Sequence, residues 1–273
     1  MPDLLDNKPD NTQSETQKKV TAFKSNRLFF VLGGFFLANA LIAEFIGVKI
    51  FSLEGTLGVE PFGLNPITEG APLTFTAGVL LWPIVFIMTD IINEYFGISG
   101  VRFLSFIAAA VIAYAFIMVF AAIGLAPDEG WWQGAYKDNG VPKAQDAYRA
   151  VFGQGLWIIV ASIIAFLVGQ FIDALIFKKI KNKLGEKRIW MRATVSTLVS
   201  QFIDSYLVLY IAFVIGADWS MTMFFAIGTV NYIYKVLAAI ALIPLLYAVR
   251  YAIEQYLGKD VATELKAMAM EQK

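Results

Sequence analysis

Long apolar runs alternate with short polar connections along most of the chain. Six of these runs reach the roughly 20 residues that a bilayer-spanning helix needs. They are Leu28–Phe51, Leu73–Phe96, Val101–Leu125, Gly155–Phe177, Ala193–Gly216 and Met221–Val249. The polar segment 1–26 predicts a disordered cytoplasmic tail, and 258–273 predicts a cytoplasmic C-terminal tail. The pattern therefore predicts an all-α integral membrane protein, with six transmembrane helices forming one domain over residues 27–257.

Basic residues indicate how the runs are oriented. Lys and Arg gather before the first run and in the connection between the fourth and fifth runs, from Lys178 to Arg192. The connection after the first run carries Glu54, Glu60 and Glu69, with neither Lys nor Arg. Because short cytoplasmic flanks are enriched in Lys and Arg, both termini are predicted to be cytoplasmic.

Two outer connections are long. The connection Ser52–Pro72 is rich in proline and glycine, which predicts a structured turn or lid rather than a helix. Lys143–Phe152 is amphipathic and predicts a segment on the membrane surface. Plain solvent-exposed loops are the alternative for both.

Composition narrows the range of functions. The chain is 58% hydrophobic and 16% charged, against about half and about a quarter in soluble domains. A net charge of zero gives no reason to expect nucleic acid as a partner. There is no His and no Cys, which excludes the usual catalytic triads and the commonest metal ligands. We therefore expect no catalytic residue, no metal and no cofactor. An intramembrane enzyme and a purely structural membrane protein are the weaker alternatives.

The segment Pro83–Gly97 carries three polar side chains at membrane depth. Asp90, Asn93 and Glu94 stand at positions i, i+3 and i+4, so they share one face of a helix that Gly97 ends. Ionisable groups inside a span usually mark a substrate or ion pathway. A structural hydrogen-bond network is the alternative.

A short pattern occurs twice. Gly169–Gln170–Phe171–Ile172–Asp173 is echoed by Ser200–Gln201–Phe202–Ile203–Asp204, which places Gln and Asp three residues apart in the fourth and fifth runs. Chance similarity is the alternative. The sixth run adds a polar face of its own with Asn231, Tyr234 and Lys235.

These observations give two groups of candidate residues. The predicted substrate-binding residues are Asp90, Asn93, Glu94, Gln170, Asp173, Gln201, Asp204, Asn231 and Lys235. The predicted supporting or coupling residues are Glu44, Arg192, Ser196, Ser200 and Tyr234. Alternatively, Lys235 forms a structural pair with Asp204 or Glu44, and Arg192 reaches the inner interface by snorkelling.

The balance of acidic and basic side chains among the candidate residues supports a ligand-accepting cavity. The candidates contain five deep carboxylates but only Lys235 and Arg192 as bases. The excess carboxylates must be protonated, contact water, or meet a cationic or hydrogen-bond-donating ligand. Carboxylates and amides match a planar heterocycle, because a carboxylate accepts both hydrogens of a guanine-like N1–H and amine. Aromatic side chains supply stacking surfaces.

At these residues the chain resembles the queuosine-precursor transporters, also grouped as vitamin-uptake-type transporters. The resemblance rests on Thr89, Asp90, Asn93, Glu94 and Gly97 between Pro83 and Gly97, on Gln170 and Asp173, on Arg192, Ser196, Thr197, Ser200, Gln201 and Asp204, and on Asn231, Tyr232, Lys235 and Pro244. It implies a six-helix inner-membrane importer of 7-deazaguanine bases: the nitrile precursor, the aminomethyl precursor or queuine. It also implies similarity to the substrate-binding subunits of energy-coupling-factor transporters.

The expected function is import of such a base, bound between the second, fourth, fifth and sixth runs. The alternative is a binding subunit for another vitamin-like molecule that requires a separate energising module. The expected partners are the small-molecule substrate and the lipid bilayer, and a homo-oligomer is compatible with the sequence.

Overall fold

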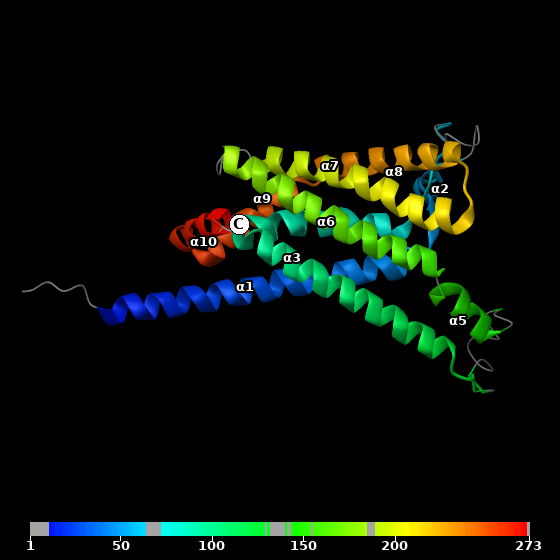
Figure 1. Cartoon of the computed structure of the whole chain (residues 1–273), viewed down its shortest axis with the longest axis horizontal. Coiled ribbons are helices and arrows are strands. Elements are labelled where there is room, and N and C mark those ends of the chain that lie inside the picture. The colour runs from blue at the N-terminus through cyan, green and yellow to red at the C-terminus, as the bar shows by residue number, and fades with distance from the viewer. Residues whose placement is uncertain are drawn as a thin grey trace, which may run out of the picture.

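The computed structural model describes residues 11–63, 72–128, 130–131, 140, 143–153, 155–184 and 189–271. Its elements follow one another along the chain as a series of helices with one small hairpin (Figure 1). They are α1 (Asn11–Ile46), β1 (Ile50–Ser52), α2 (Leu53–Leu57), β2 (Thr74–Thr76), the 3₁₀ helix η1 (Ala77–Leu80), α3 (Trp82–Ile123), α5 (Ala144–Phe152), α6 (Leu156–Leu184), α7 (Ile189–Leu209), the π-helix η2 (Tyr210–Ile215), α8 (Met221–Ala241), α9 (Ile243–Leu257) and α10 (Lys259–Glu271).

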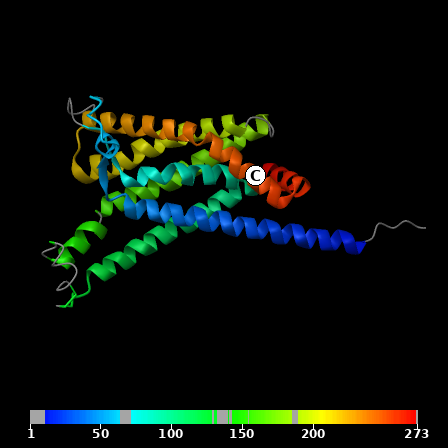
Figure 2. The same cartoon turned by 180° about the vertical axis from the view of Figure 1, so that it is seen from behind.

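The prediction of an all-α multi-pass membrane protein is confirmed. Five stretches of the described chain are long and apolar enough to cross a membrane: Lys19–Ile46, Trp82–Ile123, Ala144–Lys183, Trp190–Ile215 and Met221–Ala241. The sequence predicted six because it separated the second and third runs, which adjoin at a kink within α3 and therefore count here as one stretch. The arms of α3 on either side of Gly97 nevertheless run in opposite directions (Figures 1 and 2).

Gly97 makes this reversal. Its backbone has φ 66° and ψ −173° inside a segment that is otherwise helical. That conformation is accessible almost only to glycine. The sequence prediction that Gly97 ends the helix of the Pro83–Gly97 segment is therefore confirmed in the backbone.

Replacing Gly97 with alanine is expected to destabilise the protein by about 1–3 kcal/mol, because alanine is strained in this conformation. The matched control is Gly34→Ala in α1, where an added Cβ meets nothing within 4 Å. We expect a lower thermal unfolding midpoint in detergent for Gly97→Ala and no decrease for Gly34→Ala. Equal midpoints for the two variants would contradict the role of Gly97.

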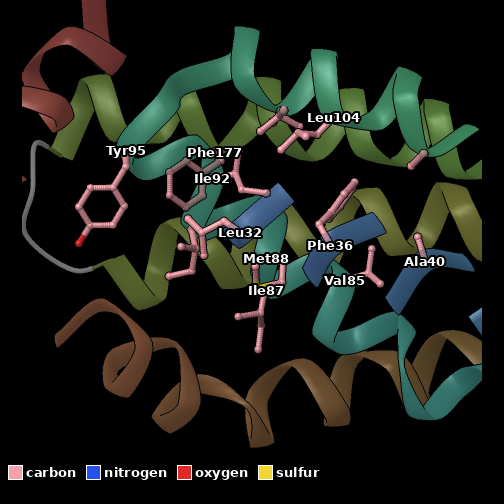
Figure 3. Packing of buried hydrophobic residues seen from close by; sticks show 14 of the residues in the cluster. Leu32, Phe36, Ala40, Val85, Ile87, Met88, Ile92, Tyr95, Leu104 and Phe177 are labelled. Carbon is pink, nitrogen blue, oxygen red and sulfur yellow. The ribbon is translucent and has the colours of Figure 1, made fainter. Parts of the chain in front are cut away.

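The helices pack around α3 and α6. The helix α6 runs along both α7 and α3, and α3 also packs against α1. Figure 3 shows the buried contact, in which Phe36 from α1, Ile92 from α3 and Phe177 from α6 belong to one cluster. In a bilayer such contacts stabilise the fold by close packing, because lipid tails are as apolar as the side chains.

A small folded unit covers the end of the molecule away from Gly97. Strands β1 and β2 pair antiparallel, with Phe51 opposite Phe75. The connection Ser52–Pro72 also contains α2, so the expectation that this segment holds no helix is wrong; residues 64–71 lie outside the described part. The reason is local, since the Ser52 hydroxyl accepts a hydrogen bond from Gly55 N–H at 2.9 Å and caps α2. The amphipathic segment Lys143–Phe152 does form a helix, α5.

Glu54 ties the two halves of this connection together. Its carboxylate accepts a hydrogen bond from the Leu73 N–H at 2.9 Å and another from the Phe62 N–H at 3.4 Å. Burial raises the pKa of Glu54, but these backbone hydrogen bonds outweigh it, so the pKa lies below its ordinary value. Glu54 is thus an ionised anchor for the outer connection.

The N-terminal segment is more structured than the sequence suggested. The helix α1 begins at Asn11, so residues 11–26 are helical, where a disordered tail was expected; residues 1–10 lie outside the described part. The C-terminal tail forms α10, which packs on α3. The start of α1, the reversal of α3 at Gly97 and α10 lie at one end of the molecule (Figures 1 and 2).

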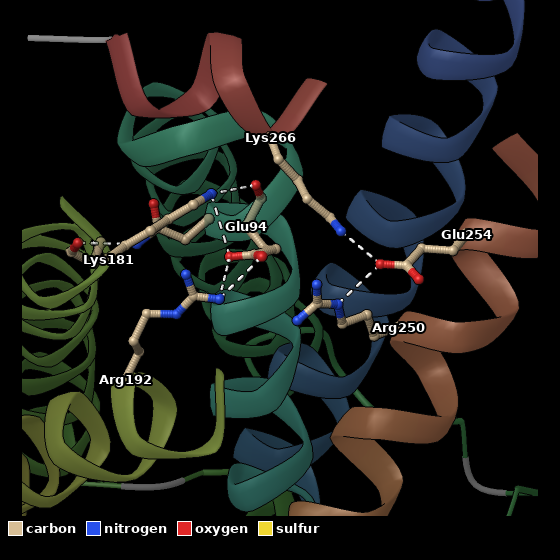
Figure 4. A network of polar contacts seen from close by, with 8 residues as sticks. Glu94, Lys181, Arg192, Arg250, Glu254 and Lys266 are labelled. Atoms are coloured by element: carbon tan, nitrogen blue, oxygen red, sulfur yellow. Dashed lines mark hydrogen bonds and ion pairs between the residues drawn. The ribbon is translucent and has the colours of Figure 1, made fainter. Parts of the chain in front are cut away.

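An ion-pair network holds α10 in place. The Glu254 Oε1 of α9 lies 2.5 Å from Lys266 Nζ and 3.0 Å from Arg250 Nε (Figure 4). Burial raises the pKa of Glu254, but hydrogen bonds from Lys266 and Arg250 outweigh it, so the folded-state pKa lies below the ordinary 4.5. The stabilisation from Glu254 is therefore complete above that pH and is lost as the pH falls through the folded-state pKa.

We expect α10 to loosen when Glu254 is protonated or replaced. A spin label at Met268→Cys reports this directly, because the chain has no other cysteine and Met268 is exposed. Label mobility should rise as the pH drops below 4.5, and should already be raised at neutral pH in Glu254→Gln. The same low mobility in both proteins at neutral pH would refute this role of Glu254.

Candidate functional site

A buried ion cluster lies beside the reversal of α3. Lys181 of α6 has its Nζ 3.2 Å from Glu94 Oε2 and donates a hydrogen bond to the Glu94 backbone carbonyl at 2.7 Å. Arg192 of α7 places Nη2 3.0 Å from both carboxylate oxygens of Glu94 (Figure 4). The Arg192 guanidinium also lies over the Phe177 ring, 5.3 Å from its centroid. With two bases and one acid, the cluster carries a net positive charge.

This cluster corrects two expectations. Snorkelling to the inner interface was the alternative considered for Arg192, and Lys181 was counted among the cytoplasmic flanking residues, but both are fully buried. The physical reason is Glu94, whose charge offsets their desolvation. The sequence did contain a signal for Lys181, because Asp173, Phe177 and Lys181 repeat every four residues and therefore share one face of α6.

A carboxyl pair lies on the same three helices. Asp90 of α3 and Asp173 of α6 are both buried, and their carboxyl groups lie next to each other. The Ser200 hydroxyl donates to Asp173 Oδ1 at 3.0 Å, and the Ser196 hydroxyl lies 3.5 Å from Asp90 Oδ1. The structure thus brings both acids together with two predicted supporting serines.

The amides have different surroundings. Asn93 donates from Nδ2 to the Ala174 carbonyl at 2.9 Å, so it joins α3 to α6 and is used within the fold. Gln170 accepts a hydrogen bond from the Thr89 hydroxyl through Oε1. The Nε2 groups of Gln170 and Gln201 are buried and make no hydrogen bond in the described structure. Such unpaired donors are costly unless another molecule satisfies them.

The remaining candidates lie nearer the opposite end. Lys235 of α8 and Asp204 of α7 form an ion pair at 2.5 Å, with side chains 14% and 15% exposed. This is one of the two pairings considered for Lys235. Glu44 accepts a hydrogen bond from the Ser162 hydroxyl, and the Tyr234 hydroxyl donates to the Val79 carbonyl at 3.4 Å. Asn231 is half-buried, one turn of α8 from Lys235.

A cavity of about 30 Å³ lies between α3, α7, α8 and the start of α9. Its polar lining consists of Asp90, Thr194, Thr197, Gln201 and Lys235; its apolar lining includes Pro83, Phe86, Leu242 and Leu246. This volume suffices for a water molecule but not for a ring system. A larger ligand therefore requires the lining helices to separate.

Three of the nine predicted substrate-binding residues line this cavity: Asp90, Gln201 and Lys235. Sequence reasoning missed Thr194, whose buried hydroxyl makes no hydrogen bond in the described structure. The signal was the spacing of Thr194, Thr197 and Gln201 at i, i+3 and i+7, which places them on one face of α7. Among the described residues, no three acidic side chains gather where they could hold a metal ion.

Comparison with known proteins places this arrangement among transporters. The chain is 26% identical over 215 residues to the "Probable queuosine precursor transporter" of Bacillus subtilis, covering 77% of this chain and 80% of that protein. It is 28% identical over 181 residues to the "Queuosine precursor transporter" of Escherichia coli, covering 64% and 72%. A Haemophilus influenzae protein, also named "Probable queuosine precursor transporter", is 25% identical over 181 residues, covering 64% and 67%.

No solved structure matches the chain. A family model also matches: residues 76–249, over half of the chain, fit the family described as "Putative vitamin uptake transporter". This segment includes α3, α6, α7 and α8, and with them every polar residue that lines the cavity. The chain therefore belongs to the vitamin uptake transporter family.

Proposed function

We propose that the chain imports queuosine precursors, the 7-deazaguanine bases, across the plasma membrane and binds them in the cavity between α3, α7, α8 and α9. The names of the three relatives support the substrate class. The observation that carries the proposal is the polar lining, in which Asp90 and the unpaired Gln201 and Thr194 belong to one small cavity.

The lining matches the edge of a 7-deazaguanine. Asp90 accepts the ring N1–H and the exocyclic amine, since a carboxylate oxygen pair suits two adjacent donors. Gln201 and Lys235 donate to the ring carbonyl and the remaining acceptor. Phe86 offers a ring face for stacking from the apolar side of the cavity. Asp173 lies behind Asp90, outside the lining, and Glu94 belongs to the ion cluster.

The closed cavity must widen to take such a base. The break between α8 and α9 is the natural place for this movement, because Leu242 and Ile243 line the cavity and Pro244 follows immediately. Proline cannot continue the hydrogen bonding of α8 into α9. Separation of α9 from α3 and α7 opens the cavity toward the Gly97 end.

The proposed topology has six crossings with both termini in the cytoplasm. The two arms of α3 count as separate crossings because Gly97 reverses the chain between them. The Gly97 end is then cytoplasmic, which agrees with the basic residues at the start of α1 and the end of α6. Asp90 and Glu94 face the cytoplasmic half, and Asp204 with Lys235 faces the outer half.

A binding titration of the purified full chain tests the proposal. The probes are the nitrile and aminomethyl 7-deazaguanines, with guanine and a panel of vitamins as comparators. We expect saturable binding of a 7-deazaguanine that Asp90→Asn abolishes and that lipid-facing Val199→Leu leaves unchanged. Binding of a vitamin in preference to every 7-deazaguanine would refute the proposal and favour the alternative of a vitamin-binding subunit.

A further inference from the structure

Within the described helices, the deep acids differ in how their charge is balanced. Glu94 contacts two bases, Lys181 and Arg192, and Asp204 contacts Lys235. Asp90 and Asp173 form no ion pair with any described residue and instead contact each other. Their other side-chain partners are hydroxyl groups of α7.

The charged groups around this pair come from every helix packed against it. The first arm of α3 contributes Glu94, one turn from Asp90, and α7 contributes Arg192, whose Nη2 binds Glu94. The helix α8 contributes Lys235, which Asp204 holds. On α7, Ser196, Thr197 and Ser200 face the pair with hydroxyls. The ion cluster has one positive charge in excess, so it balances a pair that carries a single negative charge.

Two carboxyl groups in contact cannot both stay ionised away from water, because their repulsion is strong at low dielectric. One shared proton replaces that repulsion with an O–H···O hydrogen bond. The pair with one proton and the ion cluster together are then electrically neutral.

The pair is connected to the cavity through Asp90, which lines it, whereas Asp173 does not. A second feature favours a ligand at this wall: Gln201, 3% exposed, lines the same cavity with an unpaired Nε2. A ligand that donates N–H groups to Asp90 favours Asp90 as the carboxylate and places the shared proton on Asp173. Substrate and proton therefore bind in linked fashion, each increasing the affinity of the other.

We propose that Asp173 carries one proton inward each time Asp90 carries a substrate, which makes the chain a proton–substrate symporter. The inference rests on the proposed function. The proton comes from the outer aqueous side, protonates the Asp173 carboxylate, and is released to the cytoplasm when the cavity opens there. No other bond forms or breaks. Asp173 is a positioning residue, since it acts on the substrate through Asp90.

Binding measured against pH tests the linkage. The probe is the nitrile 7-deazaguanine, which carries no ammonium group that could contribute its own charge. Wild-type affinity should fall about tenfold per pH unit once the pair loses its proton. The affinity of Asp173→Asn should be independent of pH, because an amide does not titrate. Ser200→Ala removes a donor to ionised Asp173, so the fall should move to higher pH with its size unchanged.

Transport by the full chain in liposomes tests the coupling. An interior more alkaline by one pH unit should drive about tenfold accumulation for one proton per substrate. Asp173→Asn should lose this accumulation while still exchanging substrate downhill. Two results would overturn the proposal. One is wild-type uptake that is driven by a sodium gradient and does not depend on pH, and the other is undiminished accumulation by Asp173→Asn.

The proton itself can be observed without any substrate. Infrared spectra of the purified protein should show a carbonyl stretch of a protonated carboxylic acid that Asp173→Asn lacks; any band from Glu44 is common to both proteins and cancels in the difference spectrum. Its absence from the wild type overturns the symport proposal alone. If the infrared band is present but the nitrile base binds at no pH, the proposed substrate is refuted. Symport of that base is then refuted with it. Size-exclusion profiles identify any variant that fails to fold, and Ser200→Ala then serves as the decisive variant.

Discussion

Replacing Glu94 with alanine is expected to destabilise the folded protein by about 3–5 kcal/mol, because it leaves Lys181 and Arg192 as buried charges without a counterion. All three side chains are almost completely removed from solvent, and Arg192 is one of the largest fully buried side chains. The loss is a large fraction of the stability of a typical domain. We therefore expect little folded Glu94→Ala protein after extraction in detergent.

The matched control is Glu254→Ala in α9. Glu254 also contacts two bases, but its side chain is 31% exposed, so water can reach the space beside Arg250 and Lys266 when the acid is removed. Solvent screening makes this loss smaller than the loss in Glu94→Ala. The measurement is the unfolding midpoint of each variant. A Glu94→Ala protein as stable as Glu254→Ala would show that the buried cluster does not hold α3, α6 and α7 together.

Replacing Gln201 with leucine is expected to weaken substrate binding by about 1–3 kcal/mol without destabilising the protein. The effect on stability arises in the empty protein, and the effect on binding arises in the loaded protein. In the empty protein the Gln201 Nε2 is buried and unpaired, so its removal relieves a cost. In the loaded protein the same group donates to the base, so its removal leaves a ligand acceptor unsatisfied.

The measurement is a pair of titrations on purified protein, one thermal and one with a 7-deazaguanine. The control is Val199→Leu, on the exposed face of α7 and 41% exposed, which should change neither. A Gln201→Leu variant that binds the base as tightly as wild type would remove Gln201 from the site. A variant that unfolds early would instead show that Gln201 is a structural residue.

Much of the fold follows from periodicity. The apolar runs predicted the helices because a bilayer span needs a long apolar segment, and Gly97 predicted the break because few other residues reach its backbone conformation. The number of spans differs because the two arms of α3 adjoin directly at Gly97, with no loop between them. The helix over residues 11–26 was missed because its polar composition suits disorder. The helix α10 was not predicted because it is held by tertiary contacts such as Lys266 with Glu254.

The sequence predicted which residues are candidates for the site but not how they are arranged in space. Asp90, Asn93 and Glu94 do share one face of α3, yet they serve three purposes: the cavity wall, a bond to the α6 backbone, and the ion cluster. Which purpose each serves depends on the facing helix, which one segment of sequence does not contain. Thr194 and Lys181 were missed for the same reason, because their burial results from packing and not from local composition.

Uptake into liposomes containing only the purified chain tests the central claim most directly. We predict saturable entry of a radiolabelled 7-deazaguanine with wild type and none above protein-free liposomes with Asp90→Asn. Entry with wild type also shows that no separate energising module is needed. Uptake that requires an added partner, or that Asp90→Asn supports at the wild-type rate, would contradict the account.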